Sequence, residues 1–91
     1  MSVAAVDPGR DKCGLAILSL EGEVLFHEVV ATKCLVEKLC QQREVYPFQI
    51  IVLGNGTTSA QAKQRIQRAL PAVELLVVDM GYPPEFPQAK F

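Results

Sequence analysis

A short apolar run near the start of the chain stops at an acid, and a turn follows directly. The run is Val3–Asp7, and Pro8 and Gly9 come next. A continuous apolar run closed by Pro and Gly indicates a buried β-strand. In an open α/β sheet, ligands gather beyond the carboxyl ends of the parallel strands. Asp7 is therefore predicted to lie where such a sheet places its binding groups.

The next two apolar runs lie close together in the chain. They cover residues 13–20 and 24–30, and the segment Leu20–Glu23 joins them. This connection has the composition of a tight hairpin turn, in which Gly22 can take a positive φ. Together with the first run, these segments predict three consecutive antiparallel strands.

Two later segments carry apolar residues at helical spacing. The first helix is predicted to follow an N-cap at Thr32. Its apolar stripe comprises Leu35, Val36, Leu39 and Cys40. The second helix is predicted to run through Leu70, with candidate caps at Thr57, Thr58 and Ser59. Its stripe comprises Ala62, Ile66, Ala69 and Leu70.

Two further apolar runs complete the pattern. Ile50–Leu53 predicts a parallel strand covered on both faces, and Val73–Val78 predicts another buried strand that ends at Asp79. The expected order is β-β-β-α-β-α-β in one α/β domain over residues 1–79. Three prolines make residues 80–91 an expected irregular tail, without a final helix.

Composition limits the possible partners. The 91 residues carry a net charge of −1, so nucleic acid must be bound through a local patch rather than a global field. No apolar stretch approaches the roughly 20 residues of a membrane span, and the start of the chain lacks a signal-peptide pattern. None of the three cysteines belongs to a C-x-x-C pair. They are expected to be reduced and mostly buried, which favours a cytoplasmic location.

The carboxyl ends of the predicted parallel strands hold the candidate chemistry. Asp7 offers the oxygen ligand that Mg²⁺ prefers, and Gly9 and Gly14 allow backbone N–H groups to approach a phosphate. The alternative is an Asp that only caps a β-turn. The loop 54–58 precedes a helix and could bind an anion through free N–H groups. It lacks the Lys of a P-loop, and a simple strand-to-helix loop is the alternative.

Other polar residues are expected to have ordinary structural roles. Lys63, Arg65 and Arg68 are spread around the second helix, which favours a solvated face over a phosphate-binding ridge. His27 is the only histidine, and the sequence shows no Ser or Cys partner for it. A structural role is predicted for His27.

Three blocks of sequence resemble one known family. They are Val6–Ala16, Ile51–Thr58 and Leu76–Asp79. Their order and content resemble the YqgF/RuvX-type family of RNase H-like proteins, which are related to Holliday-junction resolvases and linked to processing of the ribosomal RNA precursor. The resemblance implies an RNase H-like mixed sheet and a nuclease that uses Mg²⁺ or Mn²⁺ on RNA or branched DNA.

The resemblance also implies roles for particular residues. Asp7 and Asp79 match catalytic acids, and Asp7 matches a metal ligand. Phosphate or nucleic-acid contacts are implied for Gly9, Arg10, Lys12, Gly14, Asn55, Gly56, Thr57 and Thr58. The family usually has a glutamate where this chain has Met80. With the fourth strand between the first and fifth, Asp7 and Asp79 lie two spacings of about 4.8 Å apart, too far to share one ion. Impaired nuclease activity is therefore expected.

Two other functions fit the same pattern. Without a last helix, apolar sheet surface is uncovered, which favours a non-catalytic interaction module such as a homodimer. An Asp-x-Gly hairpin also begins the actin and sugar-kinase fold, which gives a third possibility of a single-domain phosphate binder. Those enzymes bind nucleotide between two domains, so this is the weakest of the three.

Overall fold

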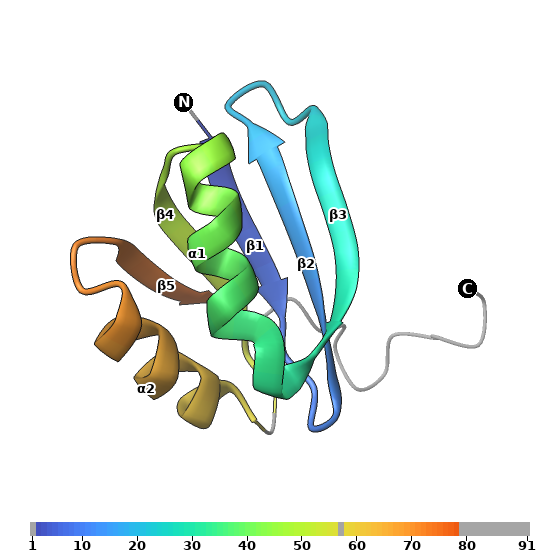
Figure 1. The fold of residues 1–91 in the computed structure, drawn as a ribbon, viewed down its shortest axis with the longest axis vertical. Coiled ribbons are helices and arrows are strands. Elements are labelled where there is room, and N and C mark those ends of the chain that lie inside the picture. The colour runs from blue at the N-terminus through green and yellow to red at the C-terminus, as the bar shows by residue number, and fades with distance from the viewer. Residues whose placement is uncertain (1, 57, 79–91) are drawn as a thin grey trace.

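The computed structural model describes residues 2–56 and 58–78, which form a mixed five-stranded sheet (Figure 1). The order across the sheet is β3-β2-β1-β4-β5. In chain order the elements are β1 (Ser2–Asp7), β2 (Lys12–Ser19), β3 (Val24–Ala31), the 3₁₀ turn η1 (Thr32–Cys34), α1 (Leu35–Val45), β4 (Phe48–Gly54), α2 (Ser59–Ala69) and β5 (Glu74–Val78). This confirms the predicted order and the predicted place of β4 between β1 and β5.

The first three strands form an antiparallel meander, and β4 and β5 continue the sheet parallel to β1. The turn between β2 and β3 is closed by the N–H of Gly22, which donates to the carbonyl of Ser19 at 2.9 Å. Gly22 has a φ of +91°, a conformation that glycine adopts without steric cost. The hairpin prediction for Leu20–Glu23 is confirmed.

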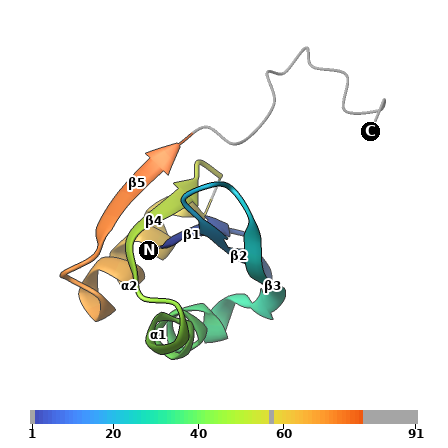
Figure 2. The same cartoon turned by 90° about the horizontal axis from the view of Figure 1, so that it is seen from above.

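Both helices pack on the same face of the sheet (Figure 2). Alternate strand residues point toward the helices and form the core. Those in β1, β2 and β4 that are buried and apolar are Ala4, Val6, Cys13, Leu15, Ile17, Phe48, Ile51 and Leu53. The prediction that β4 is covered on both faces is wrong within the described residues. Ile50 and Val52, on the other face, are only partly buried.

Three smaller expectations also differ from the structure. β5 is an edge strand, so none of its five residues is buried, although a buried strand was predicted. Ala69 is exposed because the stripe of α2 that contacts the sheet centres on Ala62 and Ile66. All three cysteines are unpaired, but only Cys13 is buried. The predicted tail, residues 80–91, lies outside the described residues.

No helix in residues 2–56 and 58–78 is both long enough and apolar enough to span a membrane.

Candidate active site at the carboxyl end of the sheet

Asp7 lies at the carboxyl end of β1, on the face of the sheet opposite the two helices. Ala4 and Val6 point toward the helices and are fully buried, so the alternation of the strand turns Asp7 to the open face. Its carboxylate is exposed, and Gly14 is its partner on β2. A Cβ placed on Gly14 would lie 3.6 Å from the Cβ of Asp7. Glycine at this register leaves room beside the carboxylate.

A shallow depression of about 280 Å³ lies beside Asp7 on the open face. Its floor is low because the neighbouring residues on β1 and β2 are small. The residues that line it on this face are Ala5, Asp7, Gly14, Ala16, His27 and Val29. The register of β1, β2 and β3 places Ala5, Ala16 and His27 in one row. His27 is thus an exposed residue of the Asp7 depression, which its isolated position in the sequence did not indicate.

The loop between β1 and β2 is held by contacts that glycine makes possible. A Cβ on Gly9 would lie only 2.2 Å from the backbone oxygen of Lys12, so the chain approaches itself too closely for any other residue. The hydroxyl of Thr32 donates to the carbonyl of Gly9 at 2.8 Å, and the N–H of Thr32 donates to the carbonyl of Asp11 at 2.9 Å. Both bonds fix the loop against the end of β3.

These bonds correct the role predicted for Thr32. It belongs to η1 and does not cap α1, whose N-cap is Cys34 and lacks a side-chain hydrogen bond. The buried thiol of Cys13 lies 3.3 Å from the same hydroxyl. Thr32 therefore secures the loop that follows Asp7, a long-range contact between residues 23 positions apart.

The loop after β4 is closed by its own hydrogen bonds. The N–H of Asn55 donates to the carbonyl of Val78 at 2.7 Å, and the N–H of Gly56 donates to the carbonyl of Gly54 at 3.1 Å. The expectation that these N–H groups are free for an anion is therefore wrong for Asn55 and Gly56. Thr58 is the N-cap of α2, without a side-chain cap bond. Thr57 lies outside the described residues.

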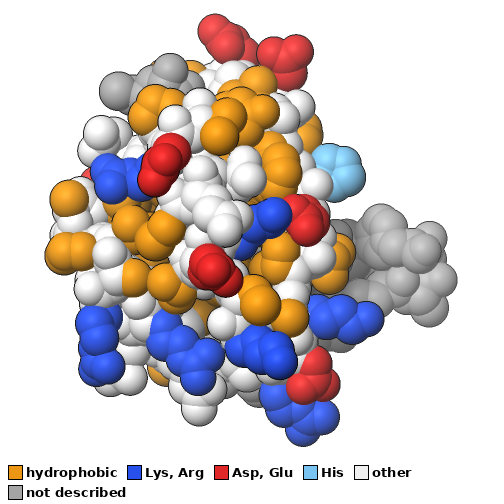
Figure 3. All heavy atoms as spheres, in the orientation of Figure 1, with side chains coloured by type: hydrophobic (Ala, Val, Ile, Leu, Met, Phe, Trp, Pro, Cys, Tyr) orange, Lys and Arg blue, Asp and Glu red, His pale blue; other side chains and the backbone are white. Residues whose placement is uncertain are grey.

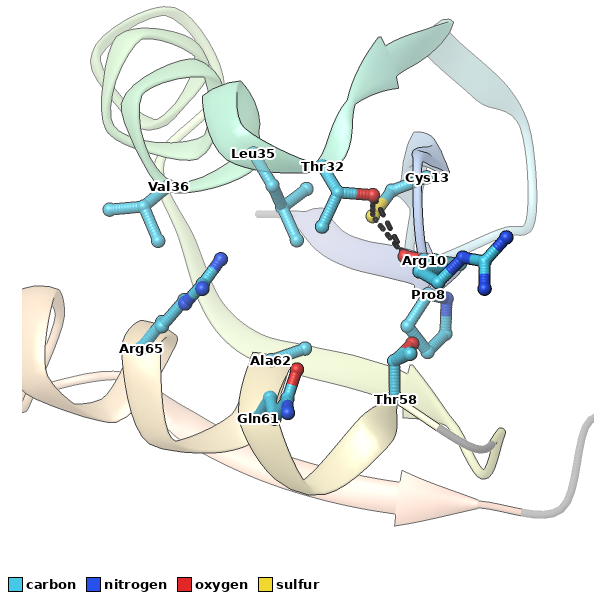
Figure 4. A pocket seen from close by; sticks show the side chains of 11 residues that line it. Pro8, Arg10, Cys13, Thr32, Leu35, Val36, Thr58, Gln61, Ala62 and Arg65 are labelled. Atoms are coloured by element: carbon cyan, nitrogen blue, oxygen red, sulfur yellow. Dashed lines mark hydrogen bonds between the residues drawn. The ribbon is translucent and has the colours of Figure 1, made fainter.

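Basic side chains gather at this end of the molecule on the helix side. Figure 3 shows Lys and Arg along its lower edge, where the loops after β1 and β4 lie in Figure 1. A cavity of about 40 Å³ opens here between the β1–β2 loop and the two helices, and Arg10 and Arg65 both line it (Figure 4). Arg10 and Arg65 also line an adjoining surface hollow with Lys33. Arg65 and Lys33 were not predicted to join Arg10.

The described residues offer one carboxylate for a cation at the Asp7 depression. Within residues 2–56 and 58–78, no three His, Cys, Asp or Glu side chains are grouped as a metal site. Glu28 pairs instead with Lys38 of α1 at 3.0 Å, on the helix side. Asp79 lies outside the described residues, and the residue before it, Val78, pairs with Gly54. One carboxylate suits a Mg²⁺ ion that keeps several waters and shares substrate phosphate oxygens.

The strand order and helix placement define an RNase H-like α/β fold, and solved structures share it. RuvC of Thermus thermophilus superposes with a TM-score of 0.69 at 20% identity, over 87% of this chain and 62% of that one. A Bacteroides thetaiotaomicron protein with an actin-like ATPase fold superposes with a TM-score of 0.63 at 10% identity, over 85% of this chain and 32% of that one. Pelota of Archaeoglobus fulgidus superposes with a TM-score of 0.63 at 15% identity, over 92% of this chain and 28% of that one.

These similarities establish the fold, and the chain spans less than two thirds of each of these proteins. No protein-family model matches the sequence, and no curated protein matches it either. The RNase H-like fold expected from the sequence is confirmed. Membership of the YqgF/RuvX-type family stays a prediction.

Proposed function

We propose that this chain is an RNase H-like nucleic-acid-binding domain with weak divalent-metal-dependent phosphodiesterase activity on RNA or branched DNA. The observation that carries the proposal is Asp7, an exposed carboxylate at the carboxyl end of β1, beside an open depression. The RuvC-like fold supports the same reading. The described residues supply only one carboxylate at this site. Because paired metal ions in nucleases are held by several acids, the expected activity is weak.

Asp7 would hold one Mg²⁺ or Mn²⁺ ion together with phosphate oxygens of the substrate. Such an ion supplies Lewis-acid stabilisation of the charge that develops on the phosphoryl oxygens. Gly14 keeps the space beside Asp7 open for a phosphate. Arg10 and Lys12, both exposed in the β1–β2 segment, would place positive charge near the backbone of the bound strand. Asp79 would be a second catalytic acid if it reached the same phosphate.

The proposal predicts that Asp7→Asn removes metal-dependent cleavage. We expect the wild-type protein to cut a branched DNA or structured RNA slowly with Mn²⁺, and the variant to cut at least about tenfold more slowly, because an amide is a poorer ligand for a hard cation. Cleavage of a labelled substrate on a gel measures both rates. Asp11→Asn is the matched control, since Asp11 is an exposed acid of the same loop whose carboxylate has Arg10, at 3.9 Å, as its only described ion-pair partner.

The outcomes of this experiment separate the parts of the proposal. Cleavage by wild type that Asp7→Asn does not slow would remove Asp7 from the site. Rapid turnover of excess substrate, abolished by Asp7→Asn, would show that the activity is not weak. Absence of any binding to RNA or branched DNA would overturn the proposed function as a whole.

A homodimeric interaction module is the second candidate, and exposed apolar side chains favour it. On the open face, Leu25 is 37% exposed and Leu76 is 42% exposed, while Val29 at the β3 edge is 67% exposed. Apolar surface of this kind commonly marks an interaction site. If it does so here, sedimentation velocity will show a dimer at high protein concentration, and Val29→Lys will shift the protein toward monomer. A monomer at all concentrations contradicts this second function.

A further inference from the structure

The helix side of the carboxyl end carries a local positive charge that the whole chain lacks. Arg10, Lys33 and Arg65 line one surface hollow around Thr32, with Asp11 as the only acid among its lining residues. Three positive and one negative side chains give this patch a charge of +2, against −1 for the whole chain. We call Arg10, Lys33 and Arg65 the basic ledge.

The backbone holds two members of the basic ledge in fixed relation. Arg10 lies between Gly9 and Asp11, and the carbonyls of both accept hydrogen bonds from Thr32, at 2.8 and 2.9 Å. Lys33 is the residue after Thr32. The loop of Arg10 is therefore fixed to the start of η1, so the two cations need little backbone ordering when they meet an anion.

The third cation comes from the face of α2 that turns toward α1. Thr58, Gln61, Ala62 and Arg65 all line the cavity, at helical spacings of three and four residues. In Figure 4 the Arg65 side chain extends from α2 toward Val36 of α1, and Arg10 points outward from its loop. Lys63 is about 200° around α2 from Arg65 and faces elsewhere. The described residues give Lys33 and Arg65 no acidic partner within ion-pair distance.

We propose that the basic ledge binds phosphates of the same nucleic-acid strand whose neighbouring phosphate reaches Asp7. The inference rests on the proposed function and adds a path: the strand bends around the carboxyl edge of the sheet, from the open face to the helix face. One short segment joins the two surfaces, because Arg10 lies three residues after Asp7 in the loop between β1 and β2.

The open form of the hollow at the basic ledge favours a backbone phosphate over an enclosed small ligand. Pockets that enclose a drug-sized molecule measure about 300–1,000 Å³. The hollow that the basic ledge lines measures about 390 Å³ but lies open at the surface, and the more enclosed cavity that Arg10 and Arg65 also line measures only about 40 Å³, which leaves no room for a nucleotide. An anionic chain that lies across exposed cations requires no such enclosure, and phosphate contacts of this kind position a strand without reading its sequence.

Salt titrations of binding test the contribution of the basic ledge. The probe is a fluorescein-labelled single-stranded RNA, with fluorescence anisotropy as the readout and EDTA present to prevent cleavage. We expect Lys33→Glu/Arg65→Glu to weaken binding at least about tenfold at low salt. The slope of log K against log salt is negative, and its magnitude should decrease by about 1.4, at about 0.7 for each lost phosphate contact on a single strand.

Lys63→Glu is the matched control, on the same helix as Arg65 and with the same change of charge per residue. The proposal requires Arg65→Glu alone to weaken binding clearly more than Lys63→Glu, with thermal unfolding followed by circular dichroism to show that both variants fold. Equal losses would overturn the basic ledge while wild-type binding still supports the proposed function. If the wild-type protein does not bind RNA, both the basic ledge and the proposed function are overturned. The same holds if a parallel assay shows binding to anionic lipid vesicles but not to RNA.

Discussion

Replacing Gly9 with alanine is expected to lower the free energy of unfolding by about 2–4 kcal/mol. The new Cβ would lie 2.2 Å from the backbone oxygen of Lys12, and a backbone atom cannot rotate away as a side chain can. The β1–β2 loop must shift, which costs about 1–3 kcal/mol in a well-packed site. The shift also weakens the bond from the Thr32 hydroxyl, worth about 1 kcal/mol.

Urea unfolding measures this difference, and Gly56→Ala is the matched control. A Cβ on Gly56 would meet its nearest atom, the backbone oxygen of Pro8, at 3.6 Å, an ordinary contact. We expect that change to cost less than about 1 kcal/mol. If the Gly9→Ala protein is as stable as the Gly56→Ala protein, the β1–β2 loop relaxes around the new methyl group without loss of free energy of unfolding. If the basic ledge depends on this loop, Gly9→Ala should also weaken RNA binding, since it loosens Arg10.

The parts of the fold that were predictable are those coded by neighbouring residues. The apolar run before Asp7, the Gly22 turn and the two helical stripes each depend on short-range spacing, and the structure has each of them, except that Ala69 of the second stripe is exposed. The place of Asp7 at the carboxyl end follows from the strand alone, because a strand ends where its turn begins.

The parts that were not predictable depend on which distant residues meet. Thr32 has the composition of an N-cap, but the folded chain offers it the carbonyl of Gly9 instead. The N–H of Asn55 follows a Gly-rich pattern that suggests an anion site, yet β5 supplies the carbonyl of Val78 as its acceptor. The basic ledge combines a loop, a 3₁₀ turn and a helix, and no spacing within one segment reveals that Arg65 and Arg10 line the same hollow.

Among the described residues, helices cover only one face of the sheet, and this gives the second large effect. Ile51 points toward the helices and is fully buried, whereas its neighbour Ile50 points to the open face and is partly buried. Truncation of a buried isoleucine to alanine costs about 2–5 kcal/mol, because the transfer energy is lost and a cavity remains. We expect Ile51→Ala to reach the upper half of that range.

Ile50→Ala is the matched control, because the same atoms are removed from the adjacent residue of the same strand. The loss of β-strand propensity is similar at both positions, so the difference between the two variants reports burial. We expect Ile50→Ala to cost about 1 kcal/mol in urea unfolding of dilute protein. Equal costs at both positions would mean that the open face is packed against something in solution. A cost at Ile50 that grows with protein concentration would identify a second copy of the chain as the cover, and would favour the interaction module.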